Sequence, residues 1–456
     1  MTKTTLKPSM RTMGALLITL SLITPASSVF IIVPGILQQA GSGAFLAMVF
    51  AAVIGVFSAF IYAELASAFP MTSGEYGIIG RVLGPAWGIV TLGVNMVANI
   101  LAMSILALGI SVYLKPVFPN LDPVATGIIT LILATLCGIL HIRTNAVVTG
   151  LFLGIEMLAL GILTWLGLTH MQRGLPEIII HPLHLGDAGL LPATPGMIGL
   201  ATSVAIFAYN GYGQAVYLGE EIHNAPKRIA RTIFLAFFIT ILTETIPVTA
   251  VLLGAPDLQS LFGASDMFGN FIAKSGGDTL NLVVSLGIAL AVFNALIALV
   301  LMIARNVYST GRDHIWSAPI NRALTLVHDR FHSPWVATLV CGGIAMAFCF
   351  VDPQILLLVT ATGMVAIYAL LSLAALVGRR NGTTAHASYK MPLFPLVPLL
   401  ALIMMAYVLY ANYLDDSVGR PSLFVTVAIM IASGLYYAFV LCRRKDWRLR
   451  GPDVSN

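Results

Sequence analysis

The sequence predicts an all-α integral membrane protein with twelve transmembrane helices. The 456-residue chain is 58% hydrophobic and only 9% charged, whereas a soluble domain carries about 25% charged residues. A membrane-spanning helix needs about 20 apolar residues. Windows of that length predict twelve spans, at residues 13–37, 43–69, 86–114, 124–141, 145–168, 195–218, 231–254, 279–304, 335–351, 354–378, 393–414 and 421–442.

The distribution of basic residues supports this count and predicts an orientation. If the N-terminus is cytoplasmic, all but four of the 24 Lys and Arg residues fall on the cytoplasmic side. The exceptions are Lys115, Arg173, Lys274 and Arg420. Because this asymmetry follows the positive-inside rule, both termini are expected in the cytoplasm. The net charge of +5 therefore indicates orientation rather than nucleic-acid binding.

One boundary, the N-terminal run and two loops need separate consideration. The break between the ninth and tenth spans depends on Asp352-Pro353 alone. The N-terminal basic residues and the apolar run ending near Ala26-Ser27-Ser28 form the pattern of a signal peptide. That run continues through Phe30, so an uncleaved first helix is expected. The loops 169–194 and 255–278 are long enough to form short lid helices outside the membrane.

Nothing in the sequence indicates catalysis or metal binding. The chain has no HExxH, CxxC, GxSxG or Walker-type motif. Its four cysteines lie in predicted spans at unrelated spacings and are expected to pack as small apolar residues. His181 and His184 have the spacing of a ligand pair, but they lie in a predicted outer loop. We expect no enzyme, no metal site and no cofactor, which leaves a secondary transporter, a channel or a receptor.

Two spans carry helix-breaking residues near their middle. The first contains Pro25, followed by the small residues Ala26, Ser27 and Ser28, and the sixth contains Ala208 to Gly213. Proline removes a backbone donor, and glycine weakens a helix. Backbone groups freed at membrane depth need a cavity or a ligand, and paired broken helices point to a binding site near the bilayer midplane. An ordinary kink is the alternative for either helix.

Four groups of short motifs lie in register along the chain. They are Ala26-Ser27-Ser28-Val29-Phe30; Tyr62-Ala63-Glu64-Leu65 with Phe69-Pro70, Ser73-Gly74-Glu75-Tyr76 and Gly84-Pro85; Phe207-Ala208-Tyr209 with Gly211-Tyr212, Glu220-Glu221, Asn224, Pro226 and Arg231; and Ala304-Arg305-Asn306-Val307-Tyr308 with Arg312-Asp313. Together they resemble the amino acid–polyamine–organocation superfamily of permeases over nearly the whole chain.

The resemblance implies a LeuT-type fold, in which helices 1–5 and 6–10 form inverted repeats, helices 1 and 6 are broken, and two C-terminal helices are appended. The expected division is a cytoplasmic N-terminus (1–12), a first repeat (13–168), an external loop (169–194), a second repeat (195–378), the last two helices (379–442) and a cytoplasmic C-terminus (443–456).

The resemblance also implies a substrate site between the two helix breaks. The substrate carboxylate would bind at Ala26, Ser27 and Ser28, because the N-terminus of a half-helix offers N–H donors and partial positive charge. The substrate ammonium would bind carbonyl oxygens of the second break. The further residues assigned to the substrate site are Phe207, Ala208, Asn210, Gly211, Tyr212 and Gln214. Independently of the resemblance, Phe30 and Tyr209 are assigned as gates because they are aromatic residues near the breaks, with ordinary packing as the alternative.

The chain departs from the family pattern at both breaks. Ser28 replaces a glycine of the first motif, which narrows access to the backbone. Asn210, Tyr212 and Gln214 are more polar than the residues usual at those positions. They either shape a pocket for a polar side chain or form interhelical hydrogen bonds that only support packing.

Two carboxylates lie at membrane depth, Glu156 in the fifth span and Glu244 in the seventh. A charged side chain at the bilayer centre costs at least about 2.5–3.5 kcal/mol, so such a residue normally faces the protein interior and has a role. Burial disfavours the ionised form of a carboxyl group, which makes both residues candidates for coupling transport to an ion. Several family members have a lysine at the position of Glu156. Because the charge is reversed here, the role of that lysine cannot be assigned to Glu156. The roles left open for Glu156 are relaying protons, holding a sodium ion and pairing with a cationic substrate. A neutral, hydrogen-bonded carboxylic acid is the alternative for both residues.

Other charged residues are expected to close the cytoplasmic face by pairing with one another. These inner-face residues are Glu64, Glu220, Glu221 and Arg305.

The sequence thus predicts a secondary-active transporter that imports amino acids across the cytoplasmic membrane of a bacterium by proton symport with alternating access. An importer or exchanger of polyamines or other organic amines is the alternative, and a transport-dead nutrient sensor is a third possibility. Sodium is the alternative coupling ion. The expected partners are a small amino acid or amine and the lipid bilayer, without nucleic acid, and the sequence leaves the oligomeric state open.

Overall fold

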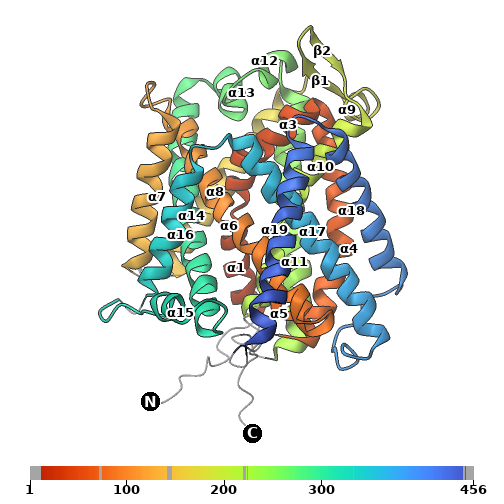
Figure 1. Cartoon of the computed structure of the whole chain (residues 1–456). Helices are drawn as coiled ribbons and strands as arrows, with labels where there is room; N and C mark the ends of the chain where they lie inside the picture. The colour runs from red at the N-terminus through yellow and green to blue at the C-terminus, as the bar shows by residue number, and fades with distance from the viewer. Residues whose placement is uncertain are drawn as a thin grey trace.

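The computed structural model describes residues 12–70, 74–140, 146–218, 222, 224–331, 333–444 and 447. This part of the chain is nearly all helical and includes one antiparallel hairpin of two short strands. One end of the molecule, here called the hairpin end, carries β1 (Leu183–Gly186), β2 (Gly189–Pro192), α12 (Leu258–Phe262) and α13 (Met267–Gly276) (Figure 1). The opposite end, here called the α5 end, carries α5 (Gly74–Val82) and α15 (Ala318–Leu324).

The chain is an integral membrane protein. Among the described residues, eight helical stretches are long and apolar enough to cross a membrane: Pro25–Ala68, Pro85–Leu114, Gly150–Thr169, Pro226–Gly254, Asp278–Arg312, Pro353–Arg380, Leu396–Leu414 and Gly419–Arg443. Two apolar helices are shorter, α7 (Pro123–Ile139) and α16 (Trp335–Phe348). The long helices are α4 (Ala44–Ala68), α6 (Pro85–Leu114), α8 (Ala146–Thr169), α11 (Ala225–Gly254), α14 (Asp278–Arg312), α17 (Pro353–Arg380), α18 (Leu396–Leu414) and α19 (Gly419–Phe439).

Both expected helix breaks are present. The first helical run consists of α1 (Thr12–Ile23), α2 (Pro25–Ser27), a π-helix (Ser28–Ile32) and α3 (Val33–Ala40). Figure 1 shows α1 toward the α5 end and α3 at the hairpin end, and α4 then runs from the hairpin end back toward the α5 end. The other interrupted run consists of α10 (Pro195–Ala208) and a 3-10 helix (Tyr212–Leu218).

The boundary expected at Asp352-Pro353 is confirmed. Helix α16 ends at Phe348, and α17 begins at Pro353 with the Asp352 carboxylate accepting the backbone N–H of Gln354 at 2.7 Å. An aspartate at this position followed by proline is a favourable helix start, because the side chain accepts a free backbone N–H and proline needs no donor. Asp122 caps α7 in the same way, through the N–H of Ala125 at 2.7 Å.

The connecting segments contain more structure than the sequence analysis predicts. The expected lid helices occur as α9 (Leu175–Ile180), α12 and α13. The hairpin β1–β2 and the separate helix α5 were not predicted, because each is too short to show a clear hydrophobic period.

Close helix packing depends on small residues at the contact between α8 and α11. A Cβ atom on Gly167 would lie 2.3 Å from the backbone carbonyl of Ala250, and one on Gly254 would lie 2.5 Å from the Gly167 carbonyl oxygen. Any larger side chain would push the two helices apart. Small residues serve this purpose in membrane proteins because lipid tails provide no hydrophobic force between helices.

A buried ion pair links α4 to the C-terminal end of α17. Arg379 donates through Nε and Nη2 to the two carboxylate oxygens of Glu64, each at 2.7 Å. Glu64 also accepts the backbone N–H of Met391 at 2.7 Å, and the Arg379 guanidinium lies 4.5 Å from the ring centre of Phe394. The carboxylate of Glu64 is 1% exposed, so these partners, and not water, stabilise its negative charge.

We expect Arg379→Met to lower the free energy of unfolding by roughly 3 kcal/mol, because it leaves the Glu64 carboxylate buried without its cation. The measurement is thermal unfolding of the purified protein in detergent. Glu64→Gln combined with Arg379→Met should recover part of the loss, since no charge then remains unpaired.

Arg420→Met is the matched control, because Arg420 pairs with the exposed Asp416 on the surface. A surface pair contributes about 0–1 kcal/mol. Equal losses for Arg379→Met and Arg420→Met would contradict a structural role for the buried pair.

Candidate functional site

The break in the first helix is fixed by backbone conformation. Thr24 adopts a left-handed conformation with φ 48°, which a non-glycine residue rarely adopts. Pro25 follows and has no N–H to continue the hydrogen bonds of α1. The π-helix begins directly after α2, at Ser28, and such π-turns are often found at functional sites. The small residues Ala26, Ser27 and Ser28 therefore lie at the start of a new half-helix.

The break after α10 depends on glycine. The backbone N–H of Asn210 donates to the carbonyl of Phe207 at 3.0 Å, which ends the helix in a tight turn. Gly211 follows with φ +124°, a conformation that favours glycine. A Cβ atom at Gly211 would lie 2.6 Å from Ile23, so glycine also allows this break to pack directly against the end of α1.

Ser28 connects the two breaks and reaches a buried carboxyl group. Its Oγ lies 3.0 Å from the carbonyl oxygen of Ala208 on α10 and 2.9 Å from Oε2 of Glu244 on α11. A hydroxyl group has only one proton to donate. If Ser28 donates to Ala208, its contact with Glu244 is a hydrogen bond only when the carboxyl group carries a proton and donates to Ser28. This arrangement suits a neutral carboxylic acid at Glu244, which is fully buried.

Glu156 contacts the other side of the first break. Its Oε2 accepts the backbone N–H of Ala26 at 3.3 Å, across 130 residues of sequence. Ala26 lies in the first turn of α2, where helical N–H groups have no partner within the helix. The Glu156 side chain, 2% exposed on α8, thus occupies a donor that an external anion could otherwise use.

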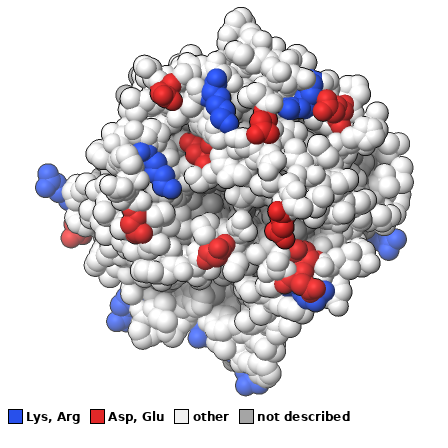
Figure 2. Space-filling view, turned by 90° about the horizontal axis from the view of Figure 1, so that it is seen from above, with Lys and Arg blue, Asp and Glu red and all other residues white. Residues whose placement is uncertain are grey.

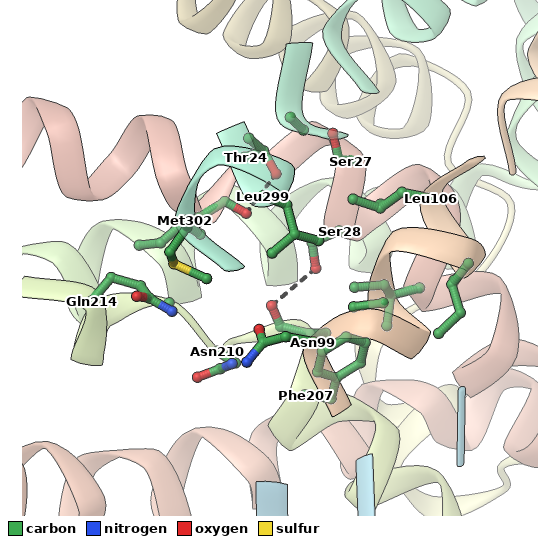
Figure 3. Close-up of a pocket in the computed structure, with 17 residues that line it drawn as sticks. Thr24, Ser27, Ser28, Asn99, Leu106, Phe207, Asn210, Gln214, Leu299 and Met302 are labelled. Carbon is green, nitrogen blue, oxygen red and sulfur yellow. Dashed lines mark hydrogen bonds between the residues drawn. The ribbon is translucent and has the colours of Figure 1, made fainter. Parts of the chain in front are cut away.

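A cavity of about 100 Å³ lies between the breaks. Figure 3 shows its lining, with the dashed bond between Ser28 and Ala208. The lining residues are Ile23, Thr24, Ser27, Ser28, Ile32, Asn99, Ala102, Ile105, Leu106, Phe207, Ala208, Asn210, Gly211, Gln214, Ala295, Leu299 and Met302. None of them is Asp, Glu, Lys, Arg or His. Hydroxyl and carboxamide groups supply the polar side chains of this cavity.

Most of the residues expected to bind substrate line this cavity. They are Ser27, Ser28, Phe207, Ala208, Asn210, Gly211 and Gln214. Ala26 does not line the cavity, because α2 turns it toward Glu156. Tyr212 does not line it either, because the 3-10 helix packs its ring against Phe237, with ring centres 4.6 Å apart.

Neither residue expected to act as a gate lines the cavity. The ring of Phe30 is buried between Tyr113 and Phe268, with ring centres 5.6 Å and 5.5 Å away. Phe268 belongs to α13, so Phe30 connects the first break with the helices of the hairpin end. Tyr209 is buried beside Thr245, whose hydroxyl lies within hydrogen-bond distance of the tyrosine hydroxyl.

Two helices that the sequence did not indicate as part of the site, α6 and α14, also line the cavity. Helix α6 supplies Asn99 and three apolar residues, and α14 supplies Ala295, Leu299 and Met302. Asn95 and Asn99 are spaced by one helical turn in an apolar span, and the Asn99 amide donates to the Asn95 carbonyl at 2.8 Å. Polar residues at this depth normally face the protein interior. The pair Asn95 and Asn99 was therefore the sequence signal that could have placed α6 at the cavity. The apolar residues of α14 gave none.

The expected inner-face residues are only partly described. Glu64 pairs with Arg379, as expected of a residue that fastens that face. Arg305 is exposed on α14 and has no hydrogen bond or ion pair among the described residues. Glu220 and Glu221 lie outside the described residues. The described part of the chain contains no group of three or more His, Cys, Asp or Glu side chains that could hold a metal ion.

The hairpin end carries scattered charges around a central hollow (Figure 2). Asp266 lies at this end, where its carboxylate accepts the N–H of Gly269 at 2.8 Å and so caps α13. Burial raises the pKa of Asp266 to about 6, although the bond from Gly269 and the charge of Lys115 oppose the shift. The docking of α13 is therefore linked to pH at this surface.

Comparison with known proteins places the chain among transport proteins. Residues 11–440 match the model of the family described as amino acid permease. An uncharacterized transporter of Mycobacterium tuberculosis is 29% identical, over 68% of this chain and 66% of the relative. The Asc-type amino acid transporter 1 of Homo sapiens is 26% identical, over 70% of this chain and 61% of the relative.

A further similar protein is the large neutral amino acids transporter small subunit 2 of Homo sapiens. It is 27% identical, over 49% of this chain and 44% of the relative. In each of these comparisons, the matched region covers less than two thirds of the relative's length.

We expect α13 to dock more firmly at acidic pH. An aspartate that is free in water titrates near 3.9, and the docked Asp266 titrates near 6. The docked helix is therefore fully stabilised by protonation below about pH 4, and this contribution is lost as the pH rises through 6. Hydrogen exchange of the α13 backbone amides, corrected for the intrinsic pH dependence, should be slower at pH 5 than at pH 7.

Asp266→Asn should remove this pH dependence while keeping the cap, because asparagine caps helices as well as aspartate. Asp257→Asn serves as the control, since Asp257 is exposed and caps α12 through Gln259 and Ser260. A pH dependence that persists in Asp266→Asn would contradict the assignment.

Proposed function

Because this chain belongs to the amino acid permease family, we propose that it is a secondary-active transporter that imports a neutral amino acid together with a proton. Family membership identifies it as a transport protein rather than an enzyme. The hydrogen bond from the Ala26 N–H to Glu156 carries the proposal of proton coupling. The uncharged lining of the cavity supports a neutral cargo.

The proposed architecture is a LeuT-type fold with twelve membrane crossings in a bacterial cytoplasmic membrane. The two interrupted runs, 12–40 and 195–218, would be the broken helices of two inverted repeats, 13–168 and 195–378. The placement of nearly all basic residues on one side supports cytoplasmic termini. The α5 end would then face the cytoplasm, and the hairpin end would face outward.

A neutral cargo fits the cavity better than a polyamine. A buried charge needs a partner of opposite charge, and a dication would find no carboxylate in the lining. The zwitterionic part of an amino acid would meet the N–H groups of the first break and the Ala208 carbonyl of the second. Two similar proteins are described as an Asc-type amino acid transporter and a large neutral amino acids transporter. A cavity of about 100 Å³ suits a small side chain.

Glu156 would couple the proton to the substrate by electrostatic repulsion. The substrate carboxylate would bind at the first break on the cavity side, beside Ser27 and Ser28, while an ionised Glu156 lies against the same turn and accepts the Ala26 N–H. Two unit negative charges about 5 Å apart repel each other by about 3 kcal/mol at an effective dielectric constant of 20. Protonation of Glu156 removes this repulsion. Proton and amino acid would therefore bind together, which is the requirement for symport.

Glu244 would have a different role. Its contact with Ser28 is on the side of the second break, where the substrate ammonium would bind. A neutral Glu244 would hold the Ser28 hydroxyl toward the Ala208 carbonyl and keep the two breaks together. Glutamine could make the same hydrogen bond through its amide group, so this role does not require a titrating group.

The test is uptake into proteoliposomes with a labelled panel of alanine, serine, leucine and putrescine, with and without an inward proton gradient. We expect the wild type to accumulate a neutral amino acid only when the gradient is present. Glu156→Gln should retain exchange of that amino acid across the membrane but lose gradient-driven accumulation, because its side chain stays neutral throughout the cycle.

Glu244→Gln and the exposed Glu177→Gln are the matched controls, and both should still accumulate substrate. Loss of accumulation in Glu244→Gln but not in Glu156→Gln would exchange the two roles and overturn the coupling proposal. Uptake of putrescine alone would overturn the proposed cargo, and accumulation driven only by sodium would overturn the proposed ion.

A further inference from the structure

A cluster of three tyrosines lies between the cavity and the α5 end. Tyr62 comes from α4, Tyr212 from the 3-10 helix and Tyr368 from α17. The ring centre of Tyr62 lies 5.7 Å from those of both Tyr212 and Tyr368, and the latter two are 6.3 Å apart. A Cβ atom at Gly213 would lie 2.9 Å from the Tyr62 ring. Tyr368 bonds to Asn210 of the cavity lining and Tyr62 bonds to Glu75 of α5, so the cluster links the cavity to the α5 end.

Polar side chains run past this tyrosine cluster from the cavity to one carboxylate. Asn99 lines the cavity and donates to the Asn95 carbonyl at 2.8 Å. The Asn95 amide lies 3.5 Å from Oε2 of Glu75, and the Tyr62 hydroxyl donates to Oε1 of Glu75 at 3.1 Å. Glu75 belongs to α5 and is 8% exposed. The cavity lining contains no carboxylate, but the Glu75 carboxylate lies next to the tyrosine cluster, in contact with Tyr62.

A second polar connection joins the cavity to the same cluster. The Tyr368 hydroxyl donates to Oδ1 of Asn210 at 3.0 Å, and Asn210 lines the cavity. The Tyr62 and Tyr368 rings are in edge contact. The tyrosine hydroxyls are thus linked to two amides of the cavity lining. Tyr368 bonds directly to Asn210, and Tyr62 is connected to Asn99 through Glu75 and Asn95.

One polar atom beside the tyrosine cluster, Gln214 Oε1, is buried without a hydrogen-bond partner among the described residues. The hydroxyl groups of Tyr212 and Ser58 are also buried, and they lie close enough to interact with each other and, in the case of Tyr212, with Tyr368. Gln214 also lines the cavity. Buried polar groups in folded proteins nearly always have a partner, and an unsatisfied one is costly. An unpaired acceptor and a group of buried hydroxyls near the Glu75 carboxylate indicate a place where a polar solute is accommodated for part of the transport cycle.

We propose that Glu75, Tyr62 and Tyr212 form a second binding site, which receives the α-ammonium group of the amino acid as it leaves the cavity toward the cytoplasm. This proposal rests on the function and orientation proposed above. The ammonium would move from the neutral carbonyl of Ala208 to a carboxylate, and hydrogen bonds between charged groups are about twice as strong as neutral ones. Tyrosine ring faces also attract an ammonium group.

The experiment measures half-saturation from each side of the membrane. Proteoliposomes containing the wild type or a variant exchange labelled alanine, serine or leucine, whichever the wild type transports best, with varied concentrations inside or outside. Glu75→Gln should raise the half-saturation concentration on the cytoplasmic side about tenfold, as expected for loss of one charge-assisted hydrogen bond. The external half-saturation concentration should change by less than about twofold.

Tyr212→Phe tests the same site without changing charge or ring packing. It should shift the cytoplasmic half-saturation in the same direction by a smaller factor. It also provides the test if Glu75→Gln fails to fold. Asp329→Asn is the control, because Asp329 is an exposed carboxylate in the segment that follows α15. Neither of its half-saturation concentrations should change.

The outcomes separate this inference from the proposed function. A wild type that exchanges no neutral amino acid contradicts the function itself. If the wild type exchanges it normally but the variants slow exchange with equal half-saturation on both sides, the residues are structural and the second site is wrong. A change confined to the external side would also overturn the site.

Discussion

Two interrupted helices bring backbone groups into the interior of a membrane protein, where no solvent is available to satisfy them. The rest of the central structure provides their partners. The Ala26 N–H donates to Glu156, and the Ala208 carbonyl accepts from Ser28, which in turn contacts Glu244. Unpaired backbone groups cost several kcal/mol each in such an environment. The positions of both buried carboxylates therefore follow from the two helix breaks.

This arrangement gives the site opposite polarity at its two sides. The first break offers N–H donors and is faced by a carboxyl group whose charge would compete with an anion. The second break offers a carbonyl oxygen, which is held by a hydroxyl that can also bond to a carboxyl group. Between them, the cavity is lined by hydroxyl, carboxamide and apolar groups. An amino acid zwitterion matches this polarity, and its net neutrality matches the absence of charged side chains in the lining.

Sequence patterns predicted the parts of this site that lie on unusual segments. Pro25 and Gly211 disturb a helix wherever they occur, so both breaks were visible without coordinates. The burial of Tyr212 against its neighbours was not visible, because the side on which a residue faces within a short 3-10 helix depends on tertiary packing. The apolar residues that α14 contributes to the cavity look like any other membrane-facing residues, and Glu156 could be recognised as unusual but not assigned a partner.

The most direct test of coupling is whether the protein takes up a proton when it binds its substrate. Saturating neutral amino acid would be added to the purified protein in weakly buffered detergent solution, at a starting pH alkaline enough for Glu156 to be ionised without substrate, with the pH followed by an indicator dye. Linkage requires that a ligand favouring the protonated form increases proton binding. We predict uptake approaching one proton per bound substrate in the wild type and none in Glu156→Gln. Substrate binding without proton uptake in the wild type, or equal uptake in the variant, would contradict the account.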